Sequence, residues 1–452
     1  MTVLAQRIPR SSAAAGAAPL LPVVGGDLQA PLVTGGSRRY TNLDYAASAP
    51  ALTSVAEHVT AVLPTYASVH RGAGYASQVS TALYENARAT IGAFVGARAD
   101  DVTVVTRNTT DALNLLAGCV PAGGRVVVLD IEHHANLLPW QRIEHTVVPF
   151  ASTLEQTLAD LETEVAAAPT ALVAVTGASN VTGEELPIGW ITALAHANGA
   201  RVVVDAAQLA PHRRIDLEAS DIDYVALSGH KLYAPFGAGV LVGRRDWLDI
   251  APPYLAGGGA VRSVDVDETE WAPAPARHEA GTPNVIGAAA LAAACTAIDG
   301  LPSGALEVHE EALRERLVSG LTSLDGVAVH RIWADSPSSI GVVTFTVDGY
   351  DPGLVAAVLS AEHGVGVRDG KFCAHPLLAR LGLQAGAIRA SVGAGSRAED
   401  VDRLVTALAD LLRHGPRWSY EPVEGRWQPT DDDARDPGEA CAKSLITNEI
   451  SR

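Results

Sequence analysis

Short apolar runs alternate with longer amphipathic stretches from about residue 80 onward. Five of the short runs are rich in β-branched residues, which favours strands at 101–106, 125–130, 171–179, 201–207 and 224–229. The stretches between them have helical spacing and include 109–118, 154–168 and 188–199. Continuous apolar strands separated by helices are typical of a parallel sheet buried on both faces. The sequence therefore predicts an α/β domain whose ligand lies beyond the carboxyl ends of the strands.

The second part of the chain has a different pattern. A helix is predicted near 304–324, followed by strands at 341–347 and 388–393 and a closing helix at 398–415. This order predicts a smaller α+β domain. The expected organisation is an N-terminal arm (1–40), a large domain (41–295), a small C-terminal domain (296–415) and a polar acidic tail (416–452) that we expect to be loosely attached.

Charge and hydropathy exclude two classes of partner. The formal net charge of −18 argues against a nucleic-acid surface, which needs a clustered basic face. Part of this charge is local, in the segment "TDDDARD" at 430–436. No run of about 18 apolar residues is present, so no membrane span is predicted. Pro19 and Pro22 interrupt the apolar stretch near the N-terminus, which favours a flexible arm over a signal peptide.

The cysteines do not form a recognisable framework. Cys119, Cys295, Cys373 and Cys441 are widely spaced and include no CxxC pair. This spacing indicates neither a set of disulfides nor a zinc site, so no metal is expected and a reducing cytoplasm is the predicted location.

The use of basic residues is unusual. Of the 33 basic side chains only three are lysines, Lys231, Lys371 and Lys443. Arginine does not lose its proton in proteins, whereas a lysine in an apolar setting does and then becomes a nucleophile. Lys231 lies in "SGHKLYAPFGAG", among small and apolar residues. The alternative is an ordinary solvated lysine, and the neighbouring motifs decide between the two.

Polar residues follow the predicted strands, where a ligand is expected. Thr109 and Thr110 begin a helix, a position that suits a phosphate group, and His133 and His134 follow a strand. The remaining ones are Asp205, Gln208, Ser228, His230 and Lys231. Each alone has an ordinary structural explanation, such as a helix cap or a surface pair. Together they match the needs of pyridoxal phosphate, whose aldehyde forms a Schiff base with a lysine and whose pyridine nitrogen needs a carboxylate.

Several motifs carry a family resemblance. They include "LDYAASAP", "SVHRGAG", "TRNTTDALNLLA", "EHHANLLPWQ", "VVVDAAQLAPHRRID", "EAGTPNV" and "VRDGKFCAHPLL", and they occur in order between residue 43 and about residue 410. The chain resembles the fold-type I pyridoxal-phosphate enzymes of the class V aminotransferase group, and within it the SufS-like cysteine desulfurases and selenocysteine lyases. The resemblance implies a mainly parallel seven-stranded sheet in the large domain.

The resemblance also implies cofactor roles. Lys231 would carry the cofactor, Asp205 would pair with the pyridine nitrogen, and His133 would stack on the ring. The residues expected at the phenolic oxygen and the phosphate are Gln208, Thr109, Thr110, Ser228 and His230. Thr282 would reach the phosphate in the neighbouring subunit, which implies a homodimer.

On the substrate side, Asn180 and Arg389 would bind the carboxylate of a small amino acid, and Arg368 and His70 are further substrate-binding candidates. Cys373 falls at the position of the nucleophilic cysteine.

Some positions depart from the family pattern. Tyr45 and Ser48 replace an asparagine and a threonine, and Lys371 and Phe372 stand where histidines usually precede the cysteine. After "IRAS" the chain continues with "VGAGS" in place of a tyrosine-asparagine pair. The cofactor residues are thus intact, while the substrate-facing residues have changed.

We therefore interpret the sequence as a cysteine desulfurase-like enzyme that converts cysteine to alanine and leaves a persulfide on Cys373, with Lys371 and Arg368 favouring the thiolate. A protein sulfur acceptor would be a further partner. The alternatives are a class V aminotransferase, a C–S lyase acting on a cysteine conjugate, or a scaffold without activity. Cys373 would be only a small apolar loop residue in these alternatives.

Overall fold

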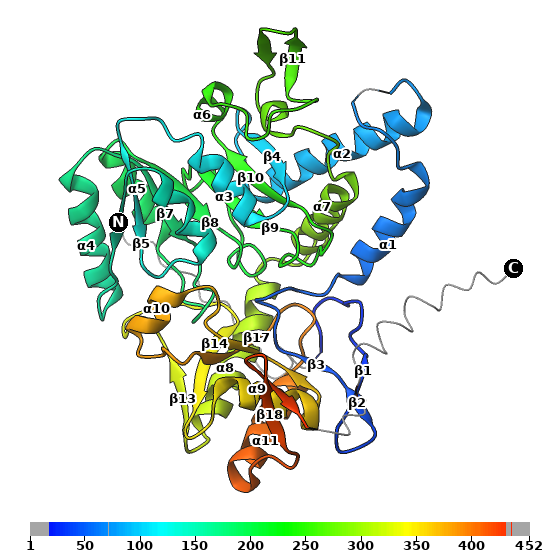
Figure 1. Cartoon of the computed structure of the whole chain (residues 1–452), viewed down its shortest axis with the longest axis vertical. Coiled ribbons are helices and arrows are strands. Elements are labelled where there is room, and N and C mark those ends of the chain that lie inside the picture. Colours follow the sequence, from blue (N-terminus) through cyan, green and yellow to red (C-terminus); the bar gives the residue numbers. More distant parts are fainter. Residues whose placement is uncertain (1–17, 71, 431–434, 436–452) are drawn as a thin grey trace, which may run out of the picture.

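The computed structural model describes residues 18–70, 72–430 and 435. Two regions, one above the other in Figure 1, are each built around one main sheet. The larger region holds a seven-stranded sheet and the smaller one a four-stranded sheet.

The large sheet has the strand order β4-β10-β9-β8-β7-β5-β6. Only β10 is antiparallel to its neighbours, and the other strands run in one direction. The strands are β4 (Val102–Thr106), β5 (Arg125–Leu129), β6 (His145–Val148), β7 (Thr170–Thr176), β8 (Arg201–Asp205), β9 (Tyr224–Ser228) and β10 (Gly239–Gly243). All five predicted strands are confirmed. The sequence did not predict β6 and β10, the first a short edge strand and the second an apolar run without its own helix.

Helices cover both faces of this sheet. They are α1 (Thr53–Val62), α2 (Tyr75–Phe94), α3 (Thr109–Ala117), α4 (Leu154–Ala167), α5 (Ile188–Ala197), α6 (Arg245–Ile250) and α7 (Val285–Asp299). Alternate strand residues face opposite sides. Val127 and Leu129 of β5 belong to the apolar cluster that includes residues of α2, α4, α5 and α7, whereas Val126 and Val128 belong to the cluster that includes residues of α3. The continuous apolar strands therefore reflect burial on both faces, as predicted.

The small region has the antiparallel strand order β13-β14-β17-β16. Its strands are β13 (Val327–His330), β14 (Val342–Val347), β16 (Arg368–Gly370) and β17 (Ala387–Ser391). Its helices are α8 (Ala305–Thr322), α9 (Pro352–His363), α10 (His375–Arg380) and α11 (Ala398–His414). The predicted helices at 304–324 and 398–415 and both predicted strands are confirmed. None of the described helices is long and apolar enough to cross a bilayer.

Shorter elements connect or extend these regions. They are the strands β11 (Val261–Val264) and β12 (Thr269–Trp271) and the single-turn helices η1 (Leu63–Thr65), η2 (His134–Asn136), η3 (Pro139–Arg142) and η4 (Ala276–His278). The pair β11–β12 forms a hairpin that projects from the large region at the top of Figure 1.

The N-terminal arm is not flexible where the structure describes it, contrary to the sequence-based expectation. From residue 18 the chain packs on the small region, where the N–H of Leu20 donates to the carbonyl oxygen of Ala394 over 2.7 Å. Strands β1 (Gln29–Pro31) and β2 (Ser37–Arg39) form a hairpin, and β3 (Thr41–Asn42) pairs with β15 (Val365–Gly366). Backbone pairing with distant segments holds this arm in place, and single-sequence patterns do not reveal such pairing. Residues 1–17 lie outside the described part.

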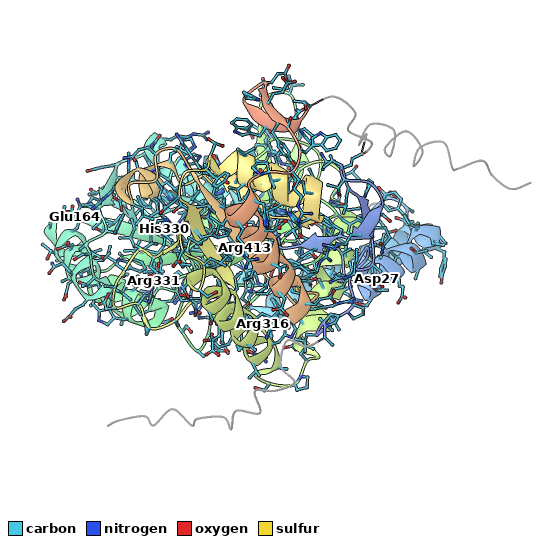
Figure 2. The ribbon with its side chains drawn as sticks, turned by 90° about the horizontal axis from the view of Figure 1, so that it is seen from below. Asp27, Glu164, Arg316, His330, Arg331 and Arg413 are labelled. Carbon is cyan, nitrogen blue, oxygen red and sulfur yellow. The ribbon has the colours of Figure 1, made fainter. Side chains whose placement is uncertain are left out.

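The expectation of a loosely attached tail is also wrong for residues 416–430. These residues form the hairpin of β18 (Tyr420–Val423) and β19 (Arg426–Pro429), which packs against α9 at the edge of the small region (Figure 2). The indole N–H of Trp427 donates to Oδ1 of Asp351 over 2.9 Å, and backbone N–H groups before β18 donate to the buried Glu362. The polar composition of residues 416–430 gave no indication of these contacts. Most of the acidic segment 430–436 lies outside the described residues.

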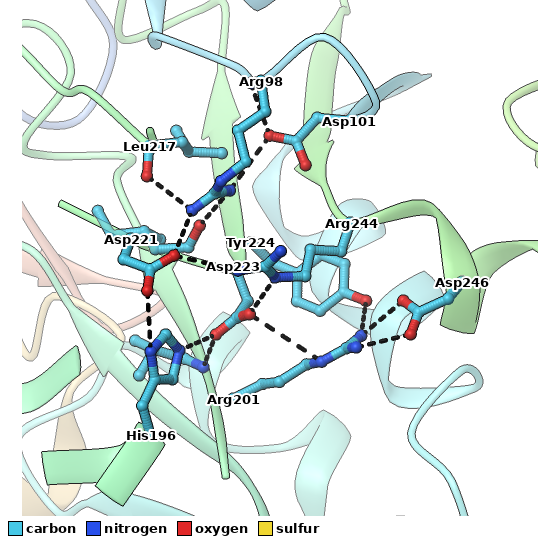
Figure 3. Close-up of polar contacts among 12 residues, drawn as sticks. Arg98, Asp101, His196, Arg201, Leu217, Asp221, Asp223, Tyr224, Arg244 and Asp246 are labelled. Carbon is cyan, nitrogen blue, oxygen red and sulfur yellow. Dashed lines mark hydrogen bonds and ion pairs between the residues drawn. The ribbon is translucent and has the colours of Figure 1, made fainter. Parts of the chain in front are cut away.

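An ion-pair network lies at the amino ends of β8 and β9 in the large sheet (Figure 3). Its centre is Asp223, a buried carboxylate that accepts the Val202 N–H over 2.9 Å. The same carboxylate accepts a hydrogen bond from Nε of Arg244 over 2.5 Å. Its Oδ2 lies 2.8 Å from Nε2 of His196. This network lies at the opposite end of the strands from the residues that the sequence assigns to chemistry.

We predict that Asp223→Ala lowers the free energy of unfolding by about 1–3 kcal/mol, because it leaves the buried Val202 N–H and the partly exposed Arg244 and His196 side chains without their acceptor. A urea titration of the variant against the parent chain measures this change. As a matched control, Arg316→Ala removes an exposed pair with Asp402 and should cost less than about 1 kcal/mol. Equal unfolding midpoints for Asp223→Ala and the parent chain would contradict the role of this network.

Candidate active site

A cavity of about 240 Å³ lies at the carboxyl ends of β7, β8 and β9, where the small region closes over the large sheet. The carboxyl ends of parallel strands meet at one edge of a sheet, so residues distant in sequence converge there. The cavity brings together most of the predicted site residues, namely Thr109, Thr110, His133, Asn180, Asp205, Gln208, Ser228, His230, Lys231, Arg368, Cys373 and Arg389.

Lys231 lies in the turn that follows β9. Its backbone N–H donates to the Ser228 carbonyl oxygen over 3.3 Å, which holds the turn against the strand end. Burial lowers the pKa of Lys231 to about 8, and the nearby Asp205 carboxylate opposes this shift. The amine is therefore largely unprotonated at mildly alkaline pH, as the sequence analysis expected for a lysine in an apolar setting.

Asp205 ends β8 and is only 4% exposed. Oδ1 accepts the Ala207 N–H over 2.9 Å. Burial raises the pKa of Asp205, whereas this hydrogen bond and Lys231 act in the opposite direction. A buried carboxyl group with so little compensation favours a cationic partner in the cavity, since an unpaired buried charge is costly.

The start of α3 forms the anion-binding end of the cavity. The backbone N–H of Thr109 donates to Oγ of Ser228 over 2.8 Å, and the two hydroxyl oxygens lie 2.7 Å apart. Asn108 caps the helix by accepting the Asp111 N–H over 2.9 Å. Hydroxyl groups beside a helix N-terminus suit a phosphate. Thr109 and Ser228, two of the residues predicted to hold the phosphate, thus meet across 119 positions of sequence.

His133 forms one wall of the cavity. Its Nδ1 accepts the Ala135 N–H over 3.0 Å, so a proton on the neutral ring resides on Nε2. Burial, assisted by the charge of Lys231, lowers the pKa of His133 to about 3. The ring is therefore neutral at working pH and presents an uncharged aromatic surface. Gln208 is fixed by donation of its Nε2 to the Ala46 carbonyl oxygen over 2.8 Å.

Glu132 is a supporting residue that the sequence analysis missed. It is 0% exposed and accepts the Thr176 N–H over 2.9 Å and Nδ2 of Asn136 over 2.8 Å. Burial raises its pKa to about 8. These bonds tie the end of β5 to β7 and hold the loop that carries His133. The sequence signal that could have revealed this residue is its position directly before His133 and His134.

Arg389 of β17 lies beneath the cavity and is 3% exposed. Its Nη1 donates to the Asn180 carbonyl oxygen over 2.7 Å, and its Nη2 lies 3.4 Å from Oδ1 of Asp44. Nε has no hydrogen-bond partner among the described residues. Burial lowers the pKa of Arg389 to about 10. A buried, partly unsatisfied guanidinium favours a carboxylate ligand.

The loop that carries Cys373 is held in a left-handed conformation. Phe372 and Cys373 have φ values of 51° and 53°, which are unfavourable for side chains of this kind. Nδ2 of Asn180 donates to the Phe372 carbonyl oxygen over 2.7 Å, and the His134 N–H donates to that of Cys373 over 2.8 Å. The Asn180 side chain, predicted to bind substrate, thus also anchors this loop.

Positive charge surrounds the Cys373 loop. Arg368 of β16 lies opposite Arg389 of β17 in the sheet register, and both line the cavity. The Arg389 guanidinium carbon lies 5.2 Å from the centre of the Phe372 ring. Phe372, one of the departures from the family pattern, therefore covers the buried arginine.

Cys373 is exposed, in contrast to the other described cysteines. Cys119 and Cys295 are buried, and burial raises the pKa of Cys119 to about 12 and that of Cys295 still further. Within the described residues, Cys373 is thus the thiol placed for chemistry. Cys441 lies outside them.

Two predicted residues are not brought to this cavity. Thr282 and His70 line a separate cavity of about 700 Å³, and Nε2 of His70 lies 2.8 Å from Oε1 of Glu85. Their assignment to a phosphate or substrate site therefore stays a prediction.

The residues of the cavity fit pyridoxal phosphate. Lys231 supplies an amine of lowered pKa, Asp205 a buried carboxyl group, and Thr109 and Ser228 an anion-binding end, all within one enclosure. Arg389 lines the same cavity and offers a guanidinium to which a substrate carboxylate would bind.

Comparisons with known proteins agree with this geometry. The sequence model of the aminotransferase class-V family matches residues 41–404. The chain is 38% identical over 359 residues to a probable cysteine desulfurase 2 of Mycobacterium leprae, covering 76% of this chain and 85% of that protein. It is 36% identical over 360 residues to a probable cysteine desulfurase of Vibrio cholerae, covering 76% and 87%.

Solved structures are similar as well. The cysteine desulfurase of Thermococcus onnurineus is 33% identical with a TM-score of 0.76, and CsdA of Escherichia coli is 32% identical with a TM-score of 0.73. Each comparison covers 83% of this chain and 95% of the other. The chain belongs to the aminotransferase class-V family, a group of pyridoxal-phosphate enzymes.

Proposed function

We propose that this protein is a pyridoxal-phosphate-dependent cysteine desulfurase that converts L-cysteine to L-alanine and leaves the sulfur as a persulfide on Cys373. The observation that carries the proposal is that Lys231 and the exposed Cys373 line one cavity. The names of the cysteine desulfurases that the chain resembles support it.

The cofactor, bound through Lys231, supplies an electron sink for the substrate's α-carbon. The protein's part is to hold and polarise it. Asp205 offers a negative charge to the pyridine nitrogen, and Thr109 and Ser228 receive the phosphate at the start of α3. His133 contributes a neutral ring beside the same space.

The substrate is held by its carboxylate. Arg389 lines the cavity, and Arg368 adds positive charge on the adjacent strand. This clamp orients the α-proton of cysteine toward Lys231. An amine whose pKa is about 8 is suited to take up that proton and return it near neutral pH.

Cys373 then takes the sulfur. Its thiolate attacks the sulfur of the substrate, an S–S bond forms, and the C–S bond breaks with its electron pair remaining on the substrate carbon. Cysteine plus the Cys373 thiol thereby give alanine plus the Cys373 persulfide, with atoms and electrons balanced. The loop holds the thiol at the mouth of the cavity through its hydrogen bonds to Asn180 and His134.

The active unit that we propose is a homodimer. Thr282 lies outside the cavity of its own chain, within a separate cavity of about 700 Å³ beside Gly281 and Pro283. A second chain that places this segment against the phosphate end of the cavity would complete the site.

We predict that Lys231→Ala abolishes alanine formation, because no other lysine lines the cavity of the described chain. The variant should also lose the covalent attachment of the cofactor, measured by borohydride reduction and peptide mapping. The control Lys371→Ala should keep the attachment, since Lys371 does not line the cavity. A label on Lys371 or Lys443 in the parent chain would overturn the assignment.

We predict that Cys373→Ala loses persulfide and alanine formation from cysteine but still binds cysteine, followed by the change in the cofactor's visible absorbance. Desulfuration needs a thiol that accepts the sulfur, whereas substrate binding depends on Arg389 and Lys231. Undiminished alanine formation would remove Cys373 from the mechanism. Release of a keto acid would instead support the aminotransferase alternative.

Thr282→Ala should weaken cofactor binding by about tenfold or more, because a hydrogen bond to a charged group contributes about 1.5–3 kcal/mol. Mixing this variant with Lys231→Ala under conditions of subunit exchange should create one intact site per heterodimer and restore tight cofactor binding. Activity equal to the average of the separate variants, or a fully active monomer in sedimentation, would contradict the dimer.

A further inference from the structure

A partly buried carboxylate beside the substrate arginine has no part in the mechanism described above. Asp44 belongs to the motif "LDYAASAP", and its side chain is 23% exposed. Its Oδ1 lies 3.4 Å from Nη2 of Arg389, and the two groups form an ion pair. Arg389 lines the active-site cavity, whereas Asp44 does not. The carboxylate therefore acts on the cavity through its charge and through the arginine.

Backbone pairing fixes the position of Asp44. The N–H of Leu43 donates to the Gly366 carbonyl oxygen over 2.8 Å, and the Ser391 N–H donates to the Leu43 carbonyl oxygen over 2.7 Å. Asp44 itself forms a β-bridge with Ser391, and its N–H donates to Oδ1 of Asn42 over 2.9 Å. The segment that carries Asp44 is thus held between β15 and β17.

Two arginines and one carboxylate share this side of the cavity. Arg368 and Arg389 lie opposite each other in β16 and β17, and both line the cavity. Burial raises the pKa of Asp44, and the charges of Arg389 and Arg368 act in the opposite direction. Mutual effects of this kind arise between charged groups that lie near one another. Together the three groups leave one net positive charge at this side of the cavity.

The side chain of the substrate meets the same charges. Under the proposed function the substrate sulfur reaches Cys373, and Cys373 lies close enough to Arg389 to affect its pKa. The loop of Cys373 also follows directly after β16, the strand that carries Arg368. A second acidic group at this end of an amino acid would therefore lie in the field of both arginines and of Asp44.

The balance of charge distinguishes two kinds of amino acid. The carboxylate of an amino acid with an uncharged side chain matches one net positive charge. A second acidic group would bring uncompensated negative charge into a largely buried site, which is costly. If Asp44 carried no charge, two arginines would instead face two anionic groups.

We propose that Asp44 sets the charge specificity of the substrate site. By cancelling one of the two positive charges beside the cavity, it favours amino acids with an uncharged side chain, such as cysteine, over those with a second acidic group. This inference rests on the proposed function, which assigns the substrate carboxylate to Arg389.

The role of Asp44 is electrostatic rather than mechanical. The guanidinium of Arg389 is held by the shorter bond from Nη1 to the Asn180 carbonyl oxygen, which measures 2.7 Å. The contact with Asp44 is longer, at 3.4 Å. Removing the charge of Asp44 should therefore change the balance without releasing Arg389.

Aspartate and asparagine test the proposal, because they have nearly the same shape and differ by one negative charge. The full-length holoenzyme is titrated with each amino acid, and binding is followed by the change in the cofactor's visible absorbance. The parent chain should bind aspartate no more tightly than asparagine. In Asp44→Asn the affinity for aspartate relative to asparagine should rise by about tenfold, the effect of one unit charge at about 10 Å in protein surroundings.

Further variants separate charge from shape. Asp44→Ser removes the same charge with a smaller side chain and should give the same rise. Asp44→Glu keeps the charge and should keep the ratio of the parent chain.

The matched control is Asp369→Asn. Asp369 follows Arg368 on β16, is exposed, and lines a groove beside α9 instead of the cavity. The ratio should change by less than about twofold in this variant, because solvent and salt screen an exposed charge.

A kinetic measurement checks the same property during turnover. Aspartate should inhibit alanine formation from cysteine more strongly in Asp44→Asn than in the parent chain, again by about tenfold, since it gains the same electrostatic attraction. Asparagine should inhibit both chains to a similar degree.

The outcomes are distinguishable. Equal ratios in Asp44→Asn and the parent chain, or an equal rise in Asp369→Asn, overturn the specificity role and leave the proposed function in place. Loss of both amino acids from Asp44→Asn and Asp44→Ser would make Asp44 a positioning residue for Arg389, which also overturns the proposal. A parent chain that forms neither alanine nor persulfide from cysteine overturns the proposed function itself, whereas the titrations need no sulfur transfer.

Discussion

The common direction of the strands around β7, β8 and β9 is the constraint on which the rest of the structure depends. Each of these strands ends at the same edge of the sheet, so the side chains that follow them are forced into one small volume. Asp205 and Lys231 are neighbours for this reason, although 26 positions of sequence separate them. The buried contacts of Asp223 at the other end of the strands keep this register in place.

Burial then sets the chemistry of the cavity. The same low-polarity surroundings raise the pKa of Asp205 and lower those of Lys231 and His133, because each charged form is poorly solvated. These opposite shifts create an amine that loses its proton at mildly alkaline pH, a neutral aromatic ring and a carboxyl group that favours a cationic partner. One physical cause thus produces three properties that a pyridoxal-phosphate site requires.

The small region contributes the substrate side and the sulfur chemistry. Strand β17 buries Arg389, and β16 leads into the strained loop of Phe372 and Cys373. The hairpin β18–β19 packs on α9 of the same region. The residues proposed for substrate binding and sulfur acceptance therefore lie on or directly after strands of one four-stranded sheet.

The sequence by itself determined the α/β alternation, the strands that flank the cavity and the residues from Thr109 to Lys231 that line it. These features are local, since each depends on apolar runs, helix starts and the rare lysine. The tertiary structure alone decided the order of the strands, the packing of residues 18–40 and 416–430, the anchoring role of Asn180 and the buried carboxyl group of Glu132. These depend on contacts between distant segments, such as the bond from Asn180 to Phe372 across 192 positions, and no local pattern encodes such a contact.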